Sequence, residues 1–397
     1  MTPKGRRALA SSGAALAVAG AVVIAQAVTT LPALAAPARA QQPAGSTGWR
    51  VSASVSGRGH FTVITGVAAD SGGDAWAIGV TAGHVHQNHA VIVHWTGKAW
   101  RRVQLPDKLL KGIDQGSDFL ASIGAASVRD VWIFSGKGQY LRLVGGRWTR
   151  GRLPVQKTGG LFPQSVKVFG PDDVWVFGCR ARSLNAASSN CHPFAARFNG
   201  RSWQVFRLPG EGVLGEVSAP STKDIWTITG PGEDGLATNS RSRIVHWNGT
   251  AWRAMPVQPK VPAKVQLSAI TATSGSDIWV GGTAPNAKHG SYELIRHWNG
   301  KAWTDASPAA KPTRNQPLME DLVPDGAGGI WELALSGNYE DTSRIRHFSH
   351  GRWLAPANVD WVLIKLAPIP GTSSTWGVGT SKNVSRGLIV LHGPRPH

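Results

Sequence analysis

Histidine is the residue type in this chain with the most direct chemical use, and three histidines gather in one short segment. His84, His86 and His89 lie within the sequence GHVHQNH. Imidazole is a common metal ligand, so the segment could hold a metal ion if the three rings converged. A short histidine-rich loop is more often solvated. We therefore expect no metal and no other cofactor, and His84, His86 and His89 remain the candidates for a ligand set.

Pairs of charged residues occupy three later segments of the same kind. They are Glu233 with Asp234, Lys288 with His289, and Glu340 with Asp341. A fold that brings these segments and the histidine segment to one face would give them a shared ligand surface. Carboxylates from separate segments could also act as acid and base on a glycosidic bond. These residues, with the three histidines, are the candidate ligand-binding residues.

No sequence motif of a known catalytic site supports an enzyme. The chain has no Gly-x-Ser-x-Gly elbow, no His-Glu-x-x-His segment and no P-loop. It has no sialidase box. A copper oxidase site would need a Tyr–Cys crosslink, but the chain has only three tyrosines, Tyr140, Tyr292 and Tyr339, and its two cysteines are expected to pair with each other. We therefore name no catalytic residue.

A repeat of about fifty residues must position all of these side chains. The phrases IVHWTGKAW, IVHWNGTAW and IRHWNGKAW begin at Ile92, Ile244 and Ile295. Each follows an Asp-x-Trp signal, such as SDIWVGG from Ser276. The Asn-Gly pair between two strand-forming runs predicts a two-residue type I′ hairpin, with Trp247 opposite Thr250. That register places Trp247 and Trp252 on one face of the sheet and His246 on the other.

Tryptophan marks each repeat twice. The Asp-x-Trp series is Trp76, Trp132, Trp175, Trp226, Trp279, Trp331 and Trp376, with Gly329 and Ser374 replacing the acid in the last two repeats. The series after the hairpin turn is Trp100, Trp148, Trp203, Trp252, Trp303 and Trp353. Trp49 has the spacing of the missing seventh member, although it stands at the front of the chain. The last repeat, ending in GLIVLHG, has no partner strand after it.

Four strand-like runs in each repeat, in a chain whose two ends complete one repeat, indicate a closed ring. We predict an all-β fold, a seven-bladed β-propeller with four-stranded blades, closed by the N-terminal strand around Trp49 joining the last blade. The blades are expected at about 61–106, 118–154, 161–209, 212–257, 265–308, 317–356, and 361–392 plus 48–55. The tryptophans should pack between blades. His94, His246, His297 and His347 recur at one position, so they should be structural.

The repeats resemble kelch motifs and the tryptophan-rich propeller repeats of secreted bacterial proteins. In kelch repeats a strand ends in Gly-Gly and a tryptophan then starts the outer strand, often followed by proline. Gly281 with Gly282, Trp303 and Pro308 match in the fifth repeat. The double glycine occurs at that position only once, and Asn-Gly replaces a longer turn. The resemblance covers nearly all of the chain after its first forty residues. It implies a propeller that binds a ligand, but it does not identify the ligand.

The N-terminal segment has the order of a secretory signal. MTPKGRR is basic, Ala8 to Val28 is apolar, and ALA at Ala33–Ala35 and ARA at Ala38–Ala40 are candidate cleavage sites. We expect residues 1–40 to be a cleaved signal peptide and 41–397 to be the propeller, with an uncleaved anchor as the alternative. The mature protein should then be secreted to the cell envelope or beyond, without a membrane span. Cys179 and Cys191 bracket one loop of the third blade, and in an exported protein they should form a disulfide.

Charge defines the partners that this chain suits. Its formal net charge is +19, from 42 Lys and Arg against 23 Asp and Glu. Such a field attracts polyanions, although no long basic run or nucleic-acid-reading motif occurs. We expect a monomeric, non-catalytic binding or scaffold module for a protein or an anionic cell-envelope polymer, with no specific nucleic acid. The alternative is a carbohydrate-active hydrolase or lyase whose acids come from several blade loops.

Overall fold

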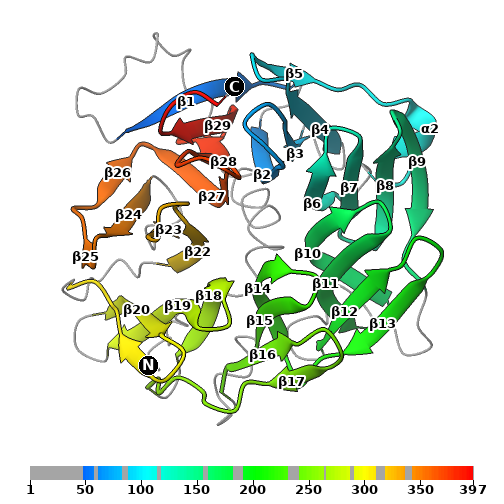
Figure 1. The fold of residues 1–397 in the computed structure, drawn as a ribbon. Helices are drawn as coiled ribbons and strands as arrows, with labels where there is room; N and C mark the ends of the chain where they lie inside the picture. The colour runs from blue at the N-terminus through cyan, green and yellow to red at the C-terminus, as the bar shows by residue number, and fades with distance from the viewer. Residues whose placement is uncertain are drawn as a thin grey trace, which may run out of the picture.

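Seven antiparallel sheets stand in a ring around a central axis (Figure 1). The computed structural model describes residues 48–57, 61–82, 88–113, 118–154, 160–181, 191–230, 241–262, 265–286, 290–309, 318–335 and 342–396. The protein is a seven-bladed β-propeller, as the repeat predicts. Within the described residues, the only helix is the single turn α2 (Asp107–Leu110), and no helix could cross a membrane. The expected signal peptide lies outside the described residues.

Each blade is a meander that runs from the axis outward. Blade one contains β2 (Phe61–Ala69), β3 (Ala75–Ala82), β4 (Asn88–Trp95) and β5 (Trp100–Arg102). Blade two contains β6 (Leu120–Ser127), β7 (Asp130–Ser135), β8 (Gln139–Val144) and β9 (Arg147–Arg152). Blade three contains β10 (Gly160–Gly170), β11 (Asp173–Ala181), β12 (His192–Phe198) and β13 (Trp203–Arg207). Blade four contains β14 (Val213–Ser221), β15 (Asp224–Gly230), β16 (Arg243–Trp247) and β17 (Trp252–Ala254).

The remaining blades follow the same order. Blade five contains β18 (Gln266–Ser274), β19 (Asp277–Asn286), β20 (Gly290–Trp298) and β21 (Trp303–Asp305). Blade six contains β22 (Leu318–Pro324), β23 (Ile330–Leu335), β24 (Ser343–Ser349) and β25 (Arg352–Trp353), and β26 (Ala357–Val359) also pairs with β24. Blade seven contains β27 (Trp361–Pro368), β28 (Thr375–Ser381), β29 (Gly387–His392) and β1 (Trp49–Val55).

Blade seven closes the ring with strands from both ends of the chain. β1 pairs antiparallel with β29, with Trp49 opposite His392 and Val55 opposite Gly387. The Arg50 guanidinium also donates a hydrogen bond to the Gly393 carbonyl at 2.6 Å. The predicted closure is therefore confirmed, and β29 has no open edge.

The hairpin turn differs from the prediction. Trp247 pairs with Trp252, not with Thr250, so the connection is a four-residue loop. The Asn248 side-chain oxygen accepts the backbone N–H groups of Thr250 and Ala251 at 3.1 and 3.0 Å, and only Gly249 has a positive φ, 90°. The predicted type I′ turn is wrong because the Asn248 side chain forms an Asx turn, which satisfies the backbone N–H groups of the loop instead. The register shift is two residues, so Trp247 and Trp252 still share a face.

Tryptophans join each blade to the one before it. Trp148 meets Trp76 with ring centroids 5.8 Å apart, and Trp203 meets Trp132 at the same distance. The pattern continues across the closure, because Trp49 meets Trp331 at 5.5 Å. Edge-to-face packing of this kind stabilises these three interfaces beyond their buried area. The outer-strand tryptophan of one blade therefore packs on the second strand of the preceding blade.

Every innermost strand carries a β-bulge at about the same place. The register shifts in β2, β6, β10, β14, β18, β22 and β27 where the strand pairs with its neighbour. A bulge bends the strand and re-aims a side chain. Ser268, at the bulge of β18, donates a hydrogen bond to the Met319 carbonyl of the next inner strand at 3.0 Å. The seven bulges thus mark one ring around the axis.

Candidate functional site: central channel and basic rim

Most of the candidate residues from the sequence lie outside the described residues. These are His84, His86, Glu233, Asp234, Lys288, His289, Glu340 and Asp341. His89 is described: it is exposed in β4, with its Cα opposite that of Thr81. Among the described residues, no group of three potential metal ligands gathers. The shared loop surface stays a prediction.

The recurring histidines belong to the scaffold. The His246 ring donates a hydrogen bond from Nε2 to Asp224 Oδ1, 2.7 Å away, and it stacks on Trp226 with ring centroids 3.7 Å apart. His94, His297 and His347 make the same contacts with an aspartate and a tryptophan of their own blades. A ring held on both sides in this way is used for packing, which agrees with the expected structural role.

Arginine fills the histidine position in two blades. Arg197 forms two hydrogen bonds with Asp173, at 2.8 and 2.9 Å, and lies over Trp175. Arg142 lies over Trp132, with its guanidinium carbon 4.6 Å from the ring centroid. In blade six, where Gly329 replaces the acid of the signal, Asp325 reaches His347 from the preceding turn at 2.7 Å. A unit of one acid, one histidine or arginine, and one tryptophan thus recurs with varied residues.

The central channel carries a cluster of charged side chains from inner strands of four blades. Lys365 of β27 lies 2.6 Å from Glu216 of β14 and 3.4 Å from Asp321 of β22. Asp321 also accepts the Leu366 backbone N–H at 2.9 Å. Blade seven is therefore tied both to its neighbour, blade six, and across the axis to blade four.

Burial and mutual charge shift the pKa values in this cluster. Burial, reinforced by the Asp321 and Glu216 carboxylates, raises the pKa of Glu320 to about 8. Burial and the nearby Lys365 charge lower the pKa of Lys167. For Lys365, the attraction of Asp321 and Glu216 outweighs burial and raises the pKa. Perturbed acids and amines gathered in one channel are a candidate site on physical grounds.

Sequence reasoning missed this cluster. A signal for it existed: Lys167, Glu216, Glu320, Asp321 and Lys365 interrupt runs that otherwise read as strands, as in LMEDLVP and WVLIKLAP. An ionisable residue within a strand next to the axis has to face the channel or a partner. The bulges that aim these residues are not visible in the sequence.

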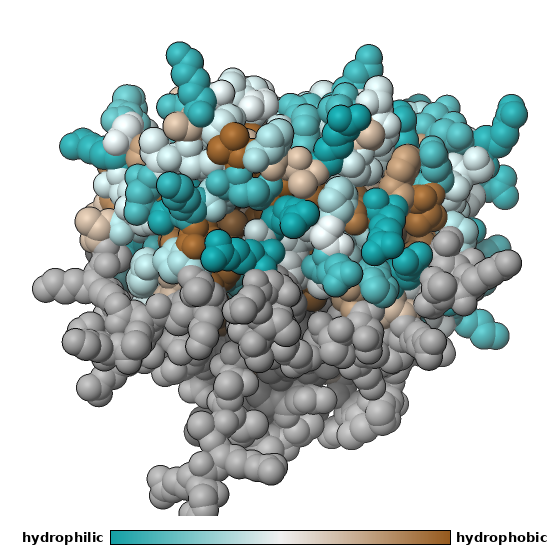
Figure 2. Space-filling view, turned by 90° about the horizontal axis from the view of Figure 1, so that it is seen from below, coloured by the Kyte–Doolittle hydropathy of each residue, from teal (hydrophilic) through white to brown (hydrophobic). Residues whose placement is uncertain are grey.

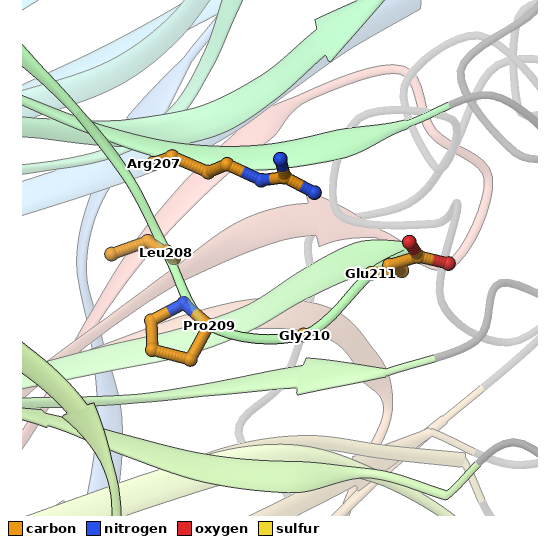
Figure 3. A pocket seen from close by; sticks show the side chains of 5 residues that line it. All are labelled: Arg207, Leu208, Pro209, Gly210 and Glu211. Atoms are coloured by element: carbon orange, nitrogen blue, oxygen red, sulfur yellow. The ribbon is translucent and has the colours of Figure 1, made fainter.

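A shallow open pocket of about 500 Å³ lies where blade three leads into blade four (Figure 3). Its lining residues are Arg207, Leu208, Pro209, Gly210 and Glu211. Arg207 and Glu211 extend to the same side, whereas Leu208 and Pro209 point the other way. One stretch of chain supplies all five residues, so no groups from separate elements converge there.

On the side of the molecule seen in Figure 2, the described surface is mostly hydrophilic. Hydrophobic residues show as small separate patches between polar side chains. Within 98–113 and 118–154, the exposed bases are Lys98, Arg101, Arg102, Lys108, Lys111, Arg129, Lys137, Arg147, Arg150 and Arg152. The only exposed acid in these two ranges is Asp107. The rim of blades one and two is therefore strongly positive.

Comparisons with known proteins support the fold. No family model matches the chain, and no curated protein sequence matches it. Among solved structures, YCF48 from Cyanidioschyzon merolae matches with a TM-score of 0.55 and 12% identity, over 87% of this chain and 99% of that one. A structure of YCF48 bound to D1 peptide matches with a TM-score of 0.53 and 12% identity, over 88% and 98%. A fucose-binding lectin of Aleuria aurantia matches with a TM-score of 0.45 and 13% identity, over 76% and 97%. At 12% identity, the likeness to the two YCF48 structures shows the fold alone.

Proposed function

We propose that this protein is a secreted, non-catalytic propeller that binds an anionic polymer of the cell envelope on its outer rim. The observation that carries the proposal is that the positive charges of the channel lie among acids, whereas those on the described part of the rim have few acids near them. The cations of the channel lie among carboxylates, whereas the exposed cations of blades one and two face solvent with one exposed acid among the described residues around them. An uncompensated positive surface attracts polyanions from a distance.

The proposed location rests on two features of the chain. The N-terminal sequence has the order of a signal peptide. Cys179 and Cys191 form a disulfide with their Cα atoms 5.4 Å apart, and such bonds persist in oxidising compartments. Mass spectrometry of protein purified from culture medium should find no free thiol and an N-terminus after residue 35 or 40. Two free thiols would contradict the disulfide, and absence of the protein from the medium would contradict the proposal of export.

Purified mature protein should be retained on an anionic wall polymer at low salt and released as salt rises, because exposed charges are screened. A neutral glycan of similar length is the control, and it should not be retained. Equal retention on both would contradict the proposal.

A protein partner is the other occupant to test. YCF48, which shares the fold, has been solved with a D1 peptide bound. A protein partner would survive salt better than a polyanion does, because part of such an interface is apolar. Salt-resistant capture of one defined protein would replace the polymer in this proposal.

The alternative, a hydrolase or lyase, now has one specific observation in its favour. The channel holds Glu320, whose pKa of about 8 keeps it protonated, near Glu216, the pairing that acid catalysis uses. The ion pair that Glu216 forms with Lys365 at 2.6 Å argues against this alternative, because it occupies the second carboxylate. Product release from any glycan by wild-type protein, lost in Glu320→Gln, would support the alternative. No release from a glycan panel would leave the binding function.

A further inference from the structure

The outer strands of blades one and two turn arginines toward each other across their junction. Trp100 of β5 packs on Trp376 of blade seven, with centroids 5.1 Å apart, so its neighbour Arg101 points the opposite way, toward blade two. On β9, Trp148 packs on Trp76 of blade one, so Arg150 and Arg152 point the same way, toward blade one. Three guanidinium groups therefore face one junction.

The segment between the two blades completes this group. The Arg150 guanidinium donates a hydrogen bond to the Lys111 carbonyl at 2.7 Å, and it also contacts the Gln139 side chain. Gln139 in turn donates to the Gly112 carbonyl at 2.8 Å. Lys111 is exposed directly after α2. We name Arg101, Lys111, Arg150 and Arg152 the junction strip.

The other junctions show that the strip is local. Three positions are equivalent to Arg101, Arg150 and Arg152 at every junction. The first is the residue directly after the outer-strand tryptophan of one blade. The other two are the second and fourth residues after the outer-strand tryptophan of the following blade. These positions hold the following residues: Arg50, Arg102 and Gln104 between blades seven and one; Thr149, Val205 and Arg207 between blades two and three; Gln204, Ala254 and Pro256 between three and four; Arg253, Asp305 and Ser307 between four and five; Thr304, Ala355 and Ala357 between five and six; and Leu354, Val51 and Ala53 between six and seven. Three basic residues occur together at these positions only between blades one and two. The junction between blades seven and one holds two, Arg50 and Arg102.

In the part of the chain that the structure describes, no acid neutralises any of these four side chains. Among the described residues, no ion pair includes Arg101, Lys111, Arg150 or Arg152. The partners of Arg150 are a carbonyl and an amide, which hold its guanidinium in place and leave its charge intact. A positioned, uncompensated guanidinium matches the two oxygens of a phosphate or a carboxylate.

We propose that the junction strip is the docking site for a linear polyanion that bears phosphate or carboxylate groups. This inference rests on the proposed function and names its surface and ligand chemistry. The four cations come from β5, the segment after α2, and β9, so they are spread over separate elements. A small anion would need donors that converge on one point, whereas a chain of charges can follow a strip. Arg50 and Arg102 extend the same positive surface toward blade seven.

The test compares two variants of equal charge loss in the full mature protein. The strip variant combines Arg101→Gln, Lys111→Gln, Arg150→Gln and Arg152→Gln. The control variant combines Arg253→Gln, Lys260→Gln, Lys301→Gln and Arg352→Gln, all exposed in blades four to six. Affinity for inorganic polyphosphate is measured across a series of salt concentrations, with thermal unfolding as the check on folding. A milder pair, Arg101→Gln with Arg152→Gln, removes no side-chain hydrogen bond between described residues, and it serves if the strip variant unfolds.

We expect the strip variant to lose roughly tenfold to a hundredfold in affinity, with a shallower salt dependence, because fewer counterions are released. The control should lose far less. Equal losses in both variants would overturn the junction strip and leave the proposed function standing, whereas failure of the wild type to bind polyphosphate or polyglutamate at low salt would overturn both. Polyglutamate in place of polyphosphate tells carboxylate from phosphate preference. Single-stranded DNA bound more tightly than both at equal charge would overturn the proposal in favour of a nucleic acid.

Discussion

Two junctions of the ring are rich in arginine, and the arginines serve opposite purposes. Between blades five and six, Arg346 bonds to Glu293 at 2.5 Å and lies 3.4 Å from Glu332. Both glutamates have side chains only 1% exposed, and Arg344 also contacts Glu293. Between blades one and two, Arg101, Arg150 and Arg152 are exposed and, among the described residues, have no acid partner.

The difference shows that the partner, not the residue type, decides what an arginine does here. At blades five and six, burial raises the pKa of Glu332 to about 7 despite the Arg346 charge, and burial with the Arg346 charge lowers the pKa of Arg344 to about 10. Charges taken out of water stabilise the fold only while they stay paired. At blades one and two, the charge stays in water and is free to attract a ligand.

Breaking the buried network should have the largest effect on stability. Arg346→Ala leaves Glu332 buried without its cation and should cost about 3–5 kcal/mol. Chemical denaturation of the purified protein measures this loss. Arg150→Gln is the matched control at the other junction. If the two substitutions destabilised equally, the contrast between the junctions would be wrong.

The junction that closes the ring should be nearly as sensitive, because it depends on apolar contact. Trp49 is 5% exposed against Trp331, and Trp49→Ala should cost about 3 kcal/mol, near the lower end for such a change because an outer strand can relax. Val51→Ala, on the same strand at 45% exposure, should change stability by about 0.5 kcal/mol or less. Thermal unfolding compares them. Equal midpoints would contradict the role of Trp49 in closure.

The channel cluster lies between the two extremes, since its side chains are mostly half-buried and only partly paired, and its effect on stability should depend on pH. Glu320 has a pKa of about 8 in the fold against an ordinary value of 4.5, so folding binds a proton between these values. Stability from this group is therefore fully present at low pH and is lost as pH rises toward 8. Glu320→Gln should raise the melting temperature at pH 8 and leave it nearly unchanged at pH 4.5.

Asp305→Asn is the control for that experiment. Although burial alone would raise the pKa of Asp305, its hydrogen bonds with Ser307 and the Arg296 charge lower it, so its contribution is lost only in acid. The pH slope between 4.5 and 8 should survive in Asp305→Asn and flatten in Glu320→Gln. If melting temperature changed with pH equally in both variants, Glu320 would not be the group responsible for the pH dependence.

The smallest effect on stability is expected where the effect on binding is largest. Arg101→Gln or Arg152→Gln should shift the free energy of unfolding by about 0.5 kcal/mol or less, as exposed positions usually do. The same variants should bind polyphosphate more weakly than the wild type. Calorimetric unfolding and a binding titration on one sample measure both. A large loss of stability would mean that the junction strip holds the blades together.

The sequence alone was sufficient for the ring and its closure. Tryptophan at fixed spacing, and a first strand that supplies what the last repeat lacks, determine these features, because each blade buries its apolar face only against a neighbour. The same spacing identified His94, His246, His297 and His347 as structural, and the disulfide followed from the loop between two adjacent strands. The hairpin register did not follow from the sequence, because the Asn248 side chain competed with the backbone turn.

Only the tertiary structure decided which charges are paired. Lys365 and Glu216 are distant in the sequence and come from blades on opposite sides of the axis, yet lie 2.6 Å apart. Arg101 and Arg150 have the same residue type as Arg344 and Arg346, and nothing in their local sequence tells the exposed pair from the pair that contacts buried glutamates. Local propensity and periodicity act over neighbouring residues, and so they specify the blades. The pairing of charges depends on the distance and the water between blades, which exist only once the ring has closed.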